Sequence, residues 1–412
     1  MYILRLIPIV ILAIVYSLII KRRIFNYNIE IWVAMGIGAF LMLATGSITP
    51  LQALYSINLH VIAYLVGMLI IGAALYESGF LGYLFKSLFE KEHKFSNLFF
   101  KLFMLIGLAS SILMNDTIAV IMTPMMVDLG KKLKLDEKFL LLLLAFGITV
   151  GSVMTPIGNP QNLIIGLQMD NPFYYFGKYL IIPTIVNLVL SFYLLKMFFY
   201  KKRDFKIEVK NLEYDIKDKA LASRSKISLV LLLFLSFLNV ILYFMFRITF
   251  SLGLIALLSA LPVLFSSSIK KVIKRFDWKT IAFFVFMFIV MQGVFDSGFF
   301  QSFILSFLKT PVEIMFASII LSQFLSNVPF VDLFIKFVAH TPVNLVTLAA
   351  GSTIAGNFLL LGAASNIIII QTAEAHGGKG LSFIDFAKYG TLITVINAVI
   401  YLLFIYIFAF LA

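Results

Sequence analysis

The sequence contains no cysteine, and this absence excludes several kinds of site. Without cysteine there are no disulfides, no thiolate metal ligands and no cysteine nucleophile. The four histidines, at positions 60, 93, 340 and 376, do not have metal-ligand spacing. No GxxxxGK[ST] phosphate loop is present, so we do not expect nucleotide-driven pumping by this chain alone. We predict that the protein is not an enzyme and carries no cofactor other than bound sodium ions.

Charged residues are also scarce, at 13% of the 412 positions, whereas 61% are hydrophobic. A soluble domain has about twice that charged share. The composition therefore predicts an all-α polytopic membrane protein, and we place it in the plasma membrane. The net charge of +13 does not indicate a nucleic-acid partner, because the basic residues form short clusters between apolar runs.

Apolar runs long enough to cross a bilayer predict about ten transmembrane helices and two re-entrant hairpins. The unbroken spans are expected at roughly 3–20, 29–47, 59–78, 174–197, 227–246, 249–266, 279–298 and 389–411. The hairpins are expected at about 98–130 and 311–339, and two broken spans at 138–170 and 344–373. Residues 80–95 have the pattern of an amphipathic helix on the membrane surface.

The positions of the lysines and arginines predict the orientation in the membrane. In this topology 28 of the 33 lie in cytoplasmic segments, including the charged linker at 198–226. The first hairpin then enters and leaves on the cytoplasmic side, and the second does so on the external side.

One interrupted stretch, from Ala145 to Ile165, organises this topology. Thr155-Pro156, Gly158 and Asn159-Pro160 lie at its centre, and each proline removes a backbone donor and disfavours helix in the residue before it. Non-helical backbone at membrane depth is tolerated where it lines a polar cavity, and Gln161 and Asn162 supply polar side chains for one. Secondary transporters build binding sites in this way.

The two halves of the chain contain a repeat. Residues 144–166 align without gaps to 348–370 with eight of 23 positions identical, including the pairs Gly158/Gly362 and Asn162/Asn366. The hairpin tips at Asn115 and Asn327 match in the same order. The predicted topology makes the halves inverted: a first repeat at 1–200, a linker at 201–226 and a second repeat at 227–412.

Asp116 is the leading candidate for an ion-binding group, because an ionisable side chain at membrane depth is costly and by default functional. It is suited to binding a cation or carrying a proton, and it also fits a helix-capping role. The paired asparagines offer carbonyl oxygens to a cation and amide groups to an anion, with interhelical hydrogen bonding as the alternative.

These residues resemble the ion transporter superfamily, which includes arsenical pump membrane proteins, NhaD-type sodium/proton antiporters, citrate transporters and divalent anion:sodium symporters. The resemblance is greatest to YbiR-type anion transporters, which have a similar Asn-Asp at the first hairpin, a similar TPIGNPQN break and a similar SQxxSNVP second hairpin. It implies that each hairpin faces a broken helix with ions and substrate between them. It also implies a homodimer in which a transport domain slides against a scaffold.

We therefore predict an ion-coupled secondary transporter of a small anion, an inorganic oxyanion such as arsenite or a carboxylate, with sodium or protons as the coupling ion. A sodium/proton antiporter of the NhaD type is the alternative. The predicted substrate- and ion-binding residues are Asn115, Asp116, Thr117, Thr155, Gly158, Asn159, Asn162, Ser326, Asn327, Pro329, Asn357, Gly362, Ser365 and Asn366. Within this set we expect sodium at Asn115, Asp116, Asn159, Asn327 and Asn366.

Overall fold

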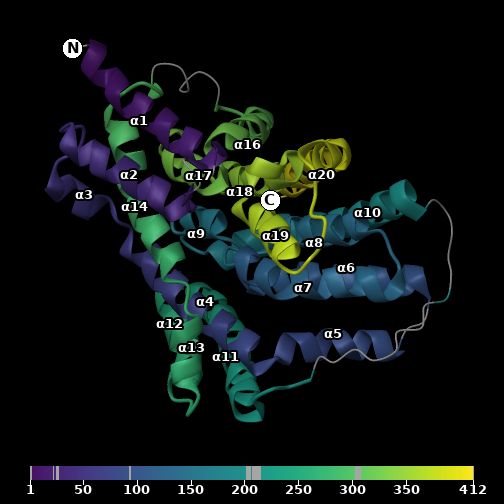
Figure 1. Ribbon diagram of the computed structural model, residues 1–412. Helices are drawn as coiled ribbons and strands as arrows, with labels where there is room; N and C mark the ends of the chain where they lie inside the picture. Colours follow the sequence, from purple (N-terminus) through teal and green to yellow (C-terminus); the bar gives the residue numbers. More distant parts are fainter. Residues whose placement is uncertain are drawn as a thin grey trace.

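The computed structural model describes residues 2–21, 23–24, 27–91, 94–200, 206, 215–301 and 308–411, and these are almost entirely helical (Figure 1). The first half contains α1 (Tyr2–Lys21), the two-residue strands β1 (Arg23–Ile24) and β2 (Tyr27–Asn28), α2 (Ile31–Ala44), α3 (Pro50–Ser56), α4 (Leu59–Ser78), α5 (Phe80–Lys91), α6 (Phe95–Ile112), α7 (Asn115–Leu133), α8 (Glu137–Gly151), the 3-10 turn η1 (Ser152–Met154), α9 (Pro160–Gly166) and α10 (Pro172–Tyr200). The second half contains α11 (Lys219–Phe246), α12 (Leu252–Leu264), α13 (Ile269–Arg275), α14 (Trp278–Asp296), α16 (Pro311–Leu325), α17 (Asn327–Phe334), η2 (Ile335–Phe337), α18 (Pro342–Phe358), η3 (Leu360–Gly362), α19 (Ala364–Ala375) and α20 (Phe383–Phe410).

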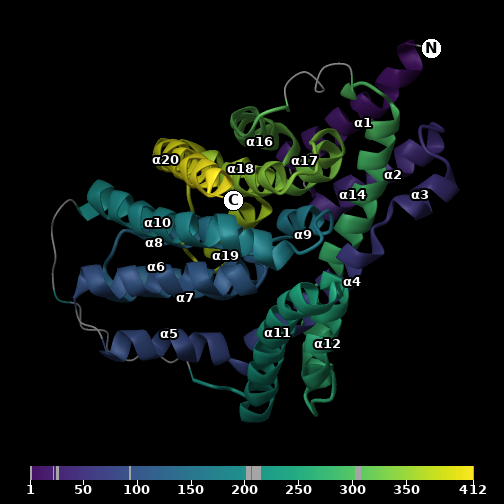
Figure 2. The same cartoon turned by 180° about the vertical axis from the view of Figure 1, so that it is seen from behind.

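The helices gather into two bundles. The span bundle consists of α1–α4 and α11–α14, and the hairpin bundle consists of α6–α10 and α16–α20. Figures 1 and 2 show them side by side from opposite directions, with α5 running beneath α7. Within the span bundle α4 packs on α12 and α2 packs on α14; within the hairpin bundle α6 packs on α8, α16 on α18, and α10 on α20.

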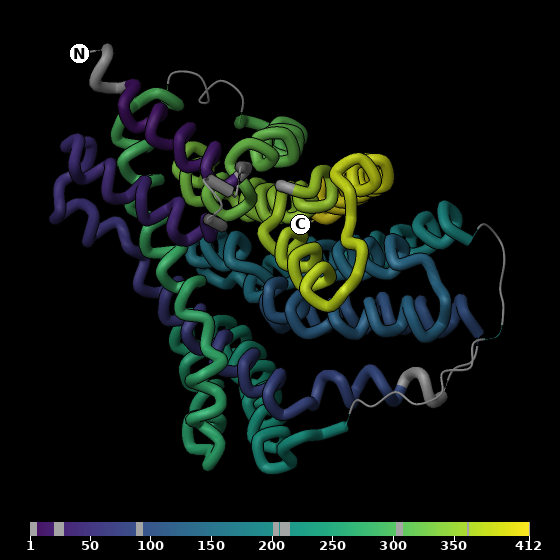
Figure 3. Tube along the Cα trace, in the orientation of Figure 1, coloured from purple at the N-terminus to yellow at the C-terminus, as the bar shows by residue number. Residues whose placement is uncertain are grey.

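The packing between helices follows the sequence repeat. α2 of the first half lies on α14 of the second, and α12 of the second half lies on α4 of the first. Figure 3 shows this packing of one half on the other, with the purple N-terminal helices beside the green α14. Reciprocal contacts of this kind are what a two-fold relation between homologous units produces. The predicted all-α fold with two repeats, two hairpins and two broken helices is confirmed.

Within the part of the chain that the structure describes, seven helices are long and apolar enough to cross a membrane: α4, α6, α8 with η1, α10, α11, α14 and α20. Shorter apolar helices are Leu6–Ile19 within α1, α2, α12 and α16. The third predicted span, at 59–78, coincides with α4. The length of the apolar runs predicted these helices, because a helix that crosses a bilayer needs about 20 consecutive, mostly apolar residues.

Two helices begin well before the residues at which the sequence predicted their spans. α11 begins at Lys219 rather than 227, because the side chain of Asp218 accepts a hydrogen bond from the backbone of Leu221 and caps the helix. α20 likewise begins at Phe383 rather than 389, after the cap Ser382. Of the linker, residues 201–205 and 207–214 lie outside the described residues. The short helices α3 and α13 were not predicted.

Segments that the charge count assigned to one side of the membrane contact one another. Lys138 forms an ion pair with Asp385 at 2.7 Å, and Lys86 pairs with Asp215 of the linker at 2.8 Å. The linker carboxylate of Asp218 accepts a hydrogen bond from Ser268 at 2.6 Å, and this bond, together with the Leu221 N–H, lowers the pKa of Asp218. These contacts support a common side for the segments around 86, 215–218 and 268, and likewise a common side for those around 138 and 385.

Close packing of α4 on α12 requires glycine at position 67. A Cβ added to Gly67 would lie 2.5 Å from the backbone carbon of Ala256, so even Gly67→Ala forces the helices apart. We expect that substitution to lower the free energy of unfolding by about 1–3 kcal/mol. The matched control is Gly177→Ala, whose added Cβ meets nothing closer than Ile181 at 3.7 Å. Thermal unfolding of the two variants in detergent tests this, and equal midpoints would contradict it.

Candidate functional site

A cavity of about 880 Å³ lies between the two bundles. Both hairpin tips reach it, through Asn115 and Asp116 on one side and Ser326 to Pro329 on the other. Both breaks reach it as well, through Pro160 and Gln161 and through Ala363 to Ser365. The first turns of α2 and α14 complete the wall from the span bundle. Two tips and two breaks that are far apart in sequence therefore share one solvent-accessible space.

The first hairpin turns at Leu113 and Met114, and α7 begins at Asn115. Asn115 is buried and its Oδ1 accepts a hydrogen bond from Ser110 Oγ at 2.9 Å. Asp116 follows in the first helical turn, where the helix dipole favours a carboxylate, and lines the cavity. Thr117 packs against α4 instead: a Cβ on Gly72 would lie 2.8 Å from its methyl group.

The first break is held by hydrogen bonds within the protein. Asn162 Nδ2 donates to the carbonyls of Ser152 and Thr155 at 3.0 and 3.1 Å, and its Oδ1 accepts from Thr353 Oγ1 at 3.1 Å. Asn159 caps α9 through the Asn162 N–H at 2.8 Å and donates to Thr353 at 3.3 Å. Both side chains are fully buried and outside the cavity wall, so they cross-link the first break to α18.

Thr155 and Gly158 shape the same loop rather than the cavity wall. The Thr155 hydroxyl donates to the carbonyl of Ser111, which joins the break to the first hairpin. A Cβ on Gly158 would lie 2.4 Å from the carbonyl oxygen of Ser152. Only glycine therefore allows the chain to pass this closely over the end of α8.

The second hairpin turns on a single residue, Ser326, which has φ +59° and ψ 160°. This backbone region is strained for any residue except glycine, and such strain concentrates at functional sites. Asn327 opens α17, and its buried Oδ1 has no hydrogen-bond partner. Pro329 follows in the first turn, where a missing N–H costs nothing. All three residues line the cavity.

The second break leaves several buried oxygens unpaired, in contrast to the first. Asn366 Nδ2 donates to the Gly356 carbonyl at 2.6 Å, but its Oδ1 has no partner. Asn357 is fully buried and neither of its side-chain polar atoms is hydrogen-bonded. Asn327 belongs to the same neighbourhood, since its Nδ2 would lie 3.4 Å from a Cβ on Gly356.

Gln323 adds a further unpaired oxygen, 2.9 Å from a Cβ built on Gly362. A buried polar atom without a partner costs free energy, so a set of such oxygens at one break fits a bound hard cation. Ser365 lines the cavity at the start of α19, whereas Gly362, Asn357 and Asn366 lie behind the wall. Among the residues that the structure describes, no group of three His, Cys, Asp or Glu side chains fits a metal.

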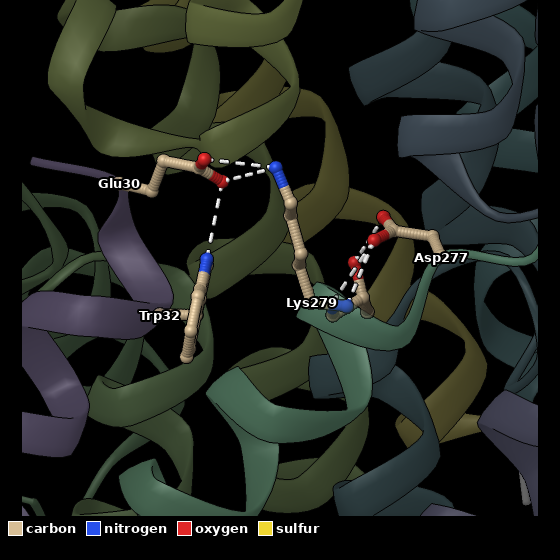
Figure 4. Close-up of polar contacts among 5 residues, drawn as sticks. Glu30, Trp32, Asp277 and Lys279 are labelled. Atoms are coloured by element: carbon tan, nitrogen blue, oxygen red, sulfur yellow. Dashed lines mark hydrogen bonds and ion pairs between the residues drawn. The ribbon is translucent and has the colours of Figure 1, made fainter. Parts of the chain in front are cut away.

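The polar residues at the span-bundle side of the cavity were not predicted from the sequence. Lys279 Nζ lies 2.7 and 2.8 Å from the two carboxylate oxygens of Glu30, and Trp32 Nε1 donates to Glu30 at 3.1 Å (Figure 4). Asp277 caps α14 beside them. A signal was available: the only two tryptophans of the chain, Trp32 and Trp278, each follow closely after an acidic residue at the start of a span.

A family model described as citrate transporter (CitMHS) matches residues 11–345. The chain belongs to the citrate transporter family. This membership confirms the resemblance to the ion transporter superfamily, and together with the long apolar helices it makes the protein a multi-pass integral membrane protein.

This chain is similar to a transporter named arsB of Dictyostelium discoideum, with 32% identity over 165 residues, which is 40% of this chain. It is also similar to the silicon efflux transporter LSI3 of Oryza sativa subsp. japonica, with 29% identity over 168 residues, 41% of this chain. The matches span 29% and 35% of those two proteins. Among solved structures it is similar to the YdaH transporter of Alcanivorax borkumensis, with a TM-score of 0.56, 11% identity and coverage of 84% and 85% of the two chains. That likeness concerns the fold alone.

Proposed function

We propose that the protein is an ion-coupled secondary transporter that moves a small anion, an inorganic oxyanion such as arsenite or a carboxylate, across the plasma membrane. The observation that carries this proposal is the cavity between the bundles, because both hairpin tips and both helix breaks line it. Interrupted helices that meet in a cavity are the usual way in which secondary transporters hold ions and substrates.

An elevator-type motion of the hairpin bundle against the span bundle fits this arrangement. The cavity wall is divided between the two bundles, so sliding one against the other changes the side to which the cavity opens. The mouth residues Glu30 and Lys279 belong to segments that the charge count assigns to the cytoplasm. We therefore interpret this conformation as open to the cytoplasm. A homodimer is part of the same proposal, by analogy with the superfamily.

We place the coupling cation, sodium in our proposal, at the second hairpin and break. Asn327, Asn357 and Asn366 supply buried carbonyl oxygens that lack protein partners. The first hairpin contributes Asp116, whose carboxylate faces the cavity and is suited to balance the charge of a cation or to carry a proton. The first break supplies no equivalent set, because its asparagines are already hydrogen-bonded.

Amide and hydroxyl groups dominate the polar part of the wall near the tips, through Asn115, Gln161, Ser326, Asn327 and Ser365. Such groups suit the hydroxyls of a weakly charged oxoacid or a single carboxylate better than a highly charged anion. The names of two relatives, arsB and silicon efflux transporter, agree with a small inorganic substrate.

Flux measurements on the purified protein in proteoliposomes test the proposal. We expect saturable uptake of arsenite or of a monocarboxylate such as acetate that depends on an imposed sodium gradient, because the cation and the anion share one cavity. Dissipation of a pH gradient by sodium with no anion present would favour the alternative, a sodium/proton antiporter with Asp116 as the exchanging carboxylate. Unsaturable flux without coupling would contradict both and indicate a channel.

A further inference from the structure

Most of the ionisable side chains in the cavity wall are acidic. The ionisable side chains of the wall among the described residues are Glu30, Asp116, Asp277 and Glu374, together with the single basic residue Lys279. An approaching anion is therefore repelled by most of the fixed charges, and the attraction comes from one ammonium group. A protein that admits anions through this cavity needs that ammonium to be reachable from water.

Lys279 satisfies this requirement. It projects from the first turn of α14, and its side chain is 61% exposed, as is 49% of the Glu30 side chain with which it pairs. Ion pairs this exposed contribute little to stability, so an incoming anion is able to displace the carboxylate. Trp32 donates to the same Glu30 carboxylate and keeps it in place while Lys279 changes partner (Figure 4).

We propose that Lys279 and Glu30 form an anion-docking site at the mouth of the cavity, in which the ammonium exchanges the Glu30 carboxylate for a carboxylate or oxyanion group of the ligand. Glu30 is the internal competitor, so a ligand must carry negative charge to replace it. The pair thereby favours anions over neutral solutes at this entrance. The inference assigns the anion entrance of the proposed transporter and rests on that function for its biological meaning.

Quenching of tryptophan fluorescence tests the site without requiring transport. Trp278→Phe leaves Trp32, beside the ion pair, as the sole tryptophan of the full-length protein. In this background we compare iodide, an anionic quencher, with acrylamide, a neutral one. Lys279→Gln should lower the Stern–Volmer constant for iodide about twofold to fivefold and leave that for acrylamide unchanged. The difference should shrink in 1 M salt, where charges are screened beyond about 3 Å.

Two further variants make the test specific. Glu30→Gln releases Lys279 and removes a negative charge beside Trp32, so it should raise the iodide constant. Lys274→Gln removes an exposed ammonium of α13 outside the cavity wall and should change neither quencher. Equal iodide quenching before and after Lys279→Gln overturns the proposal, as does an equal loss from Lys274→Gln. Lys279-dependent iodide quenching without any anion flux would retain the site and reject the transport function.

Discussion

Asp116→Asn should abolish coupled transport while the protein still folds. The substitution keeps the size of the side chain and its place in the first turn of α7 but removes the one charge that the first hairpin tip presents to the cavity. Without that charge the protein cannot balance a bound cation or carry a proton, so flux driven by sodium or pH gradients should fall to the level of empty liposomes. Uptake of labelled substrate under each gradient measures this.

The exposed carboxylate Asp170, near the end of the first broken span, provides the control. Asp170→Asn changes net charge in the same way without touching the cavity, so it should retain wild-type flux. The helix-capping role of Asp116 predicts a different outcome, in which Asp116→Asn lowers thermal stability and leaves coupling intact. Wild-type flux ratios in Asp116→Asn would refute its role in coupling.

Asn357→Leu should remove the stabilisation of the protein by sodium without lowering its stability in sodium-free buffer. Both side-chain polar atoms of Asn357 are buried and unpaired, so an apolar side chain of similar size replaces them at little or no cost. The wild-type melting temperature should rise when sodium chloride replaces choline chloride, because a ligand that binds the folded state stabilises it. The variant should show no such rise and no sodium-driven flux.

The first break supplies a contrasting variant. Asn162→Leu removes two hydrogen bonds to the carbonyls of Ser152 and Thr155, and it leaves the buried Thr353 O–H without its acceptor. A buried donor left unpaired costs about 1–3 kcal/mol. We therefore expect a lower melting temperature with or without sodium. If the two variants behave alike, the assignment of the cation to the second break is wrong.

Repetition in the sequence pairs Asn162 with Asn366, and both were among the predicted substrate- and ion-binding residues. The structure distinguishes them because their partners come from other helices. Thr353, 191 residues away in α18, satisfies the first, whereas the second has an unpaired oxygen. Whether a buried side chain finds hydrogen-bond partners depends on the residues that pack against it. A sequence repeat specifies only the local backbone.

Lys279 shows the same difference. In the sequence it is one of five basic residues at 270–279, whose clustering predicts orientation in the membrane. Its contact with Glu30 arises because α2 of the first half packs on α14 of the second half. Composition does not reveal this packing.

The sequence by itself determined the helices, the two breaks and the two hairpins of this protein. Those features follow from the length of apolar runs and from proline, glycine and asparagine acting on their own backbone. The tertiary structure decided which polar atoms are left unpaired and which charges face the cavity. Both depend on contacts between segments that are distant in the sequence. Such contacts determine whether a polar group is buried and whether it has a hydrogen-bond partner.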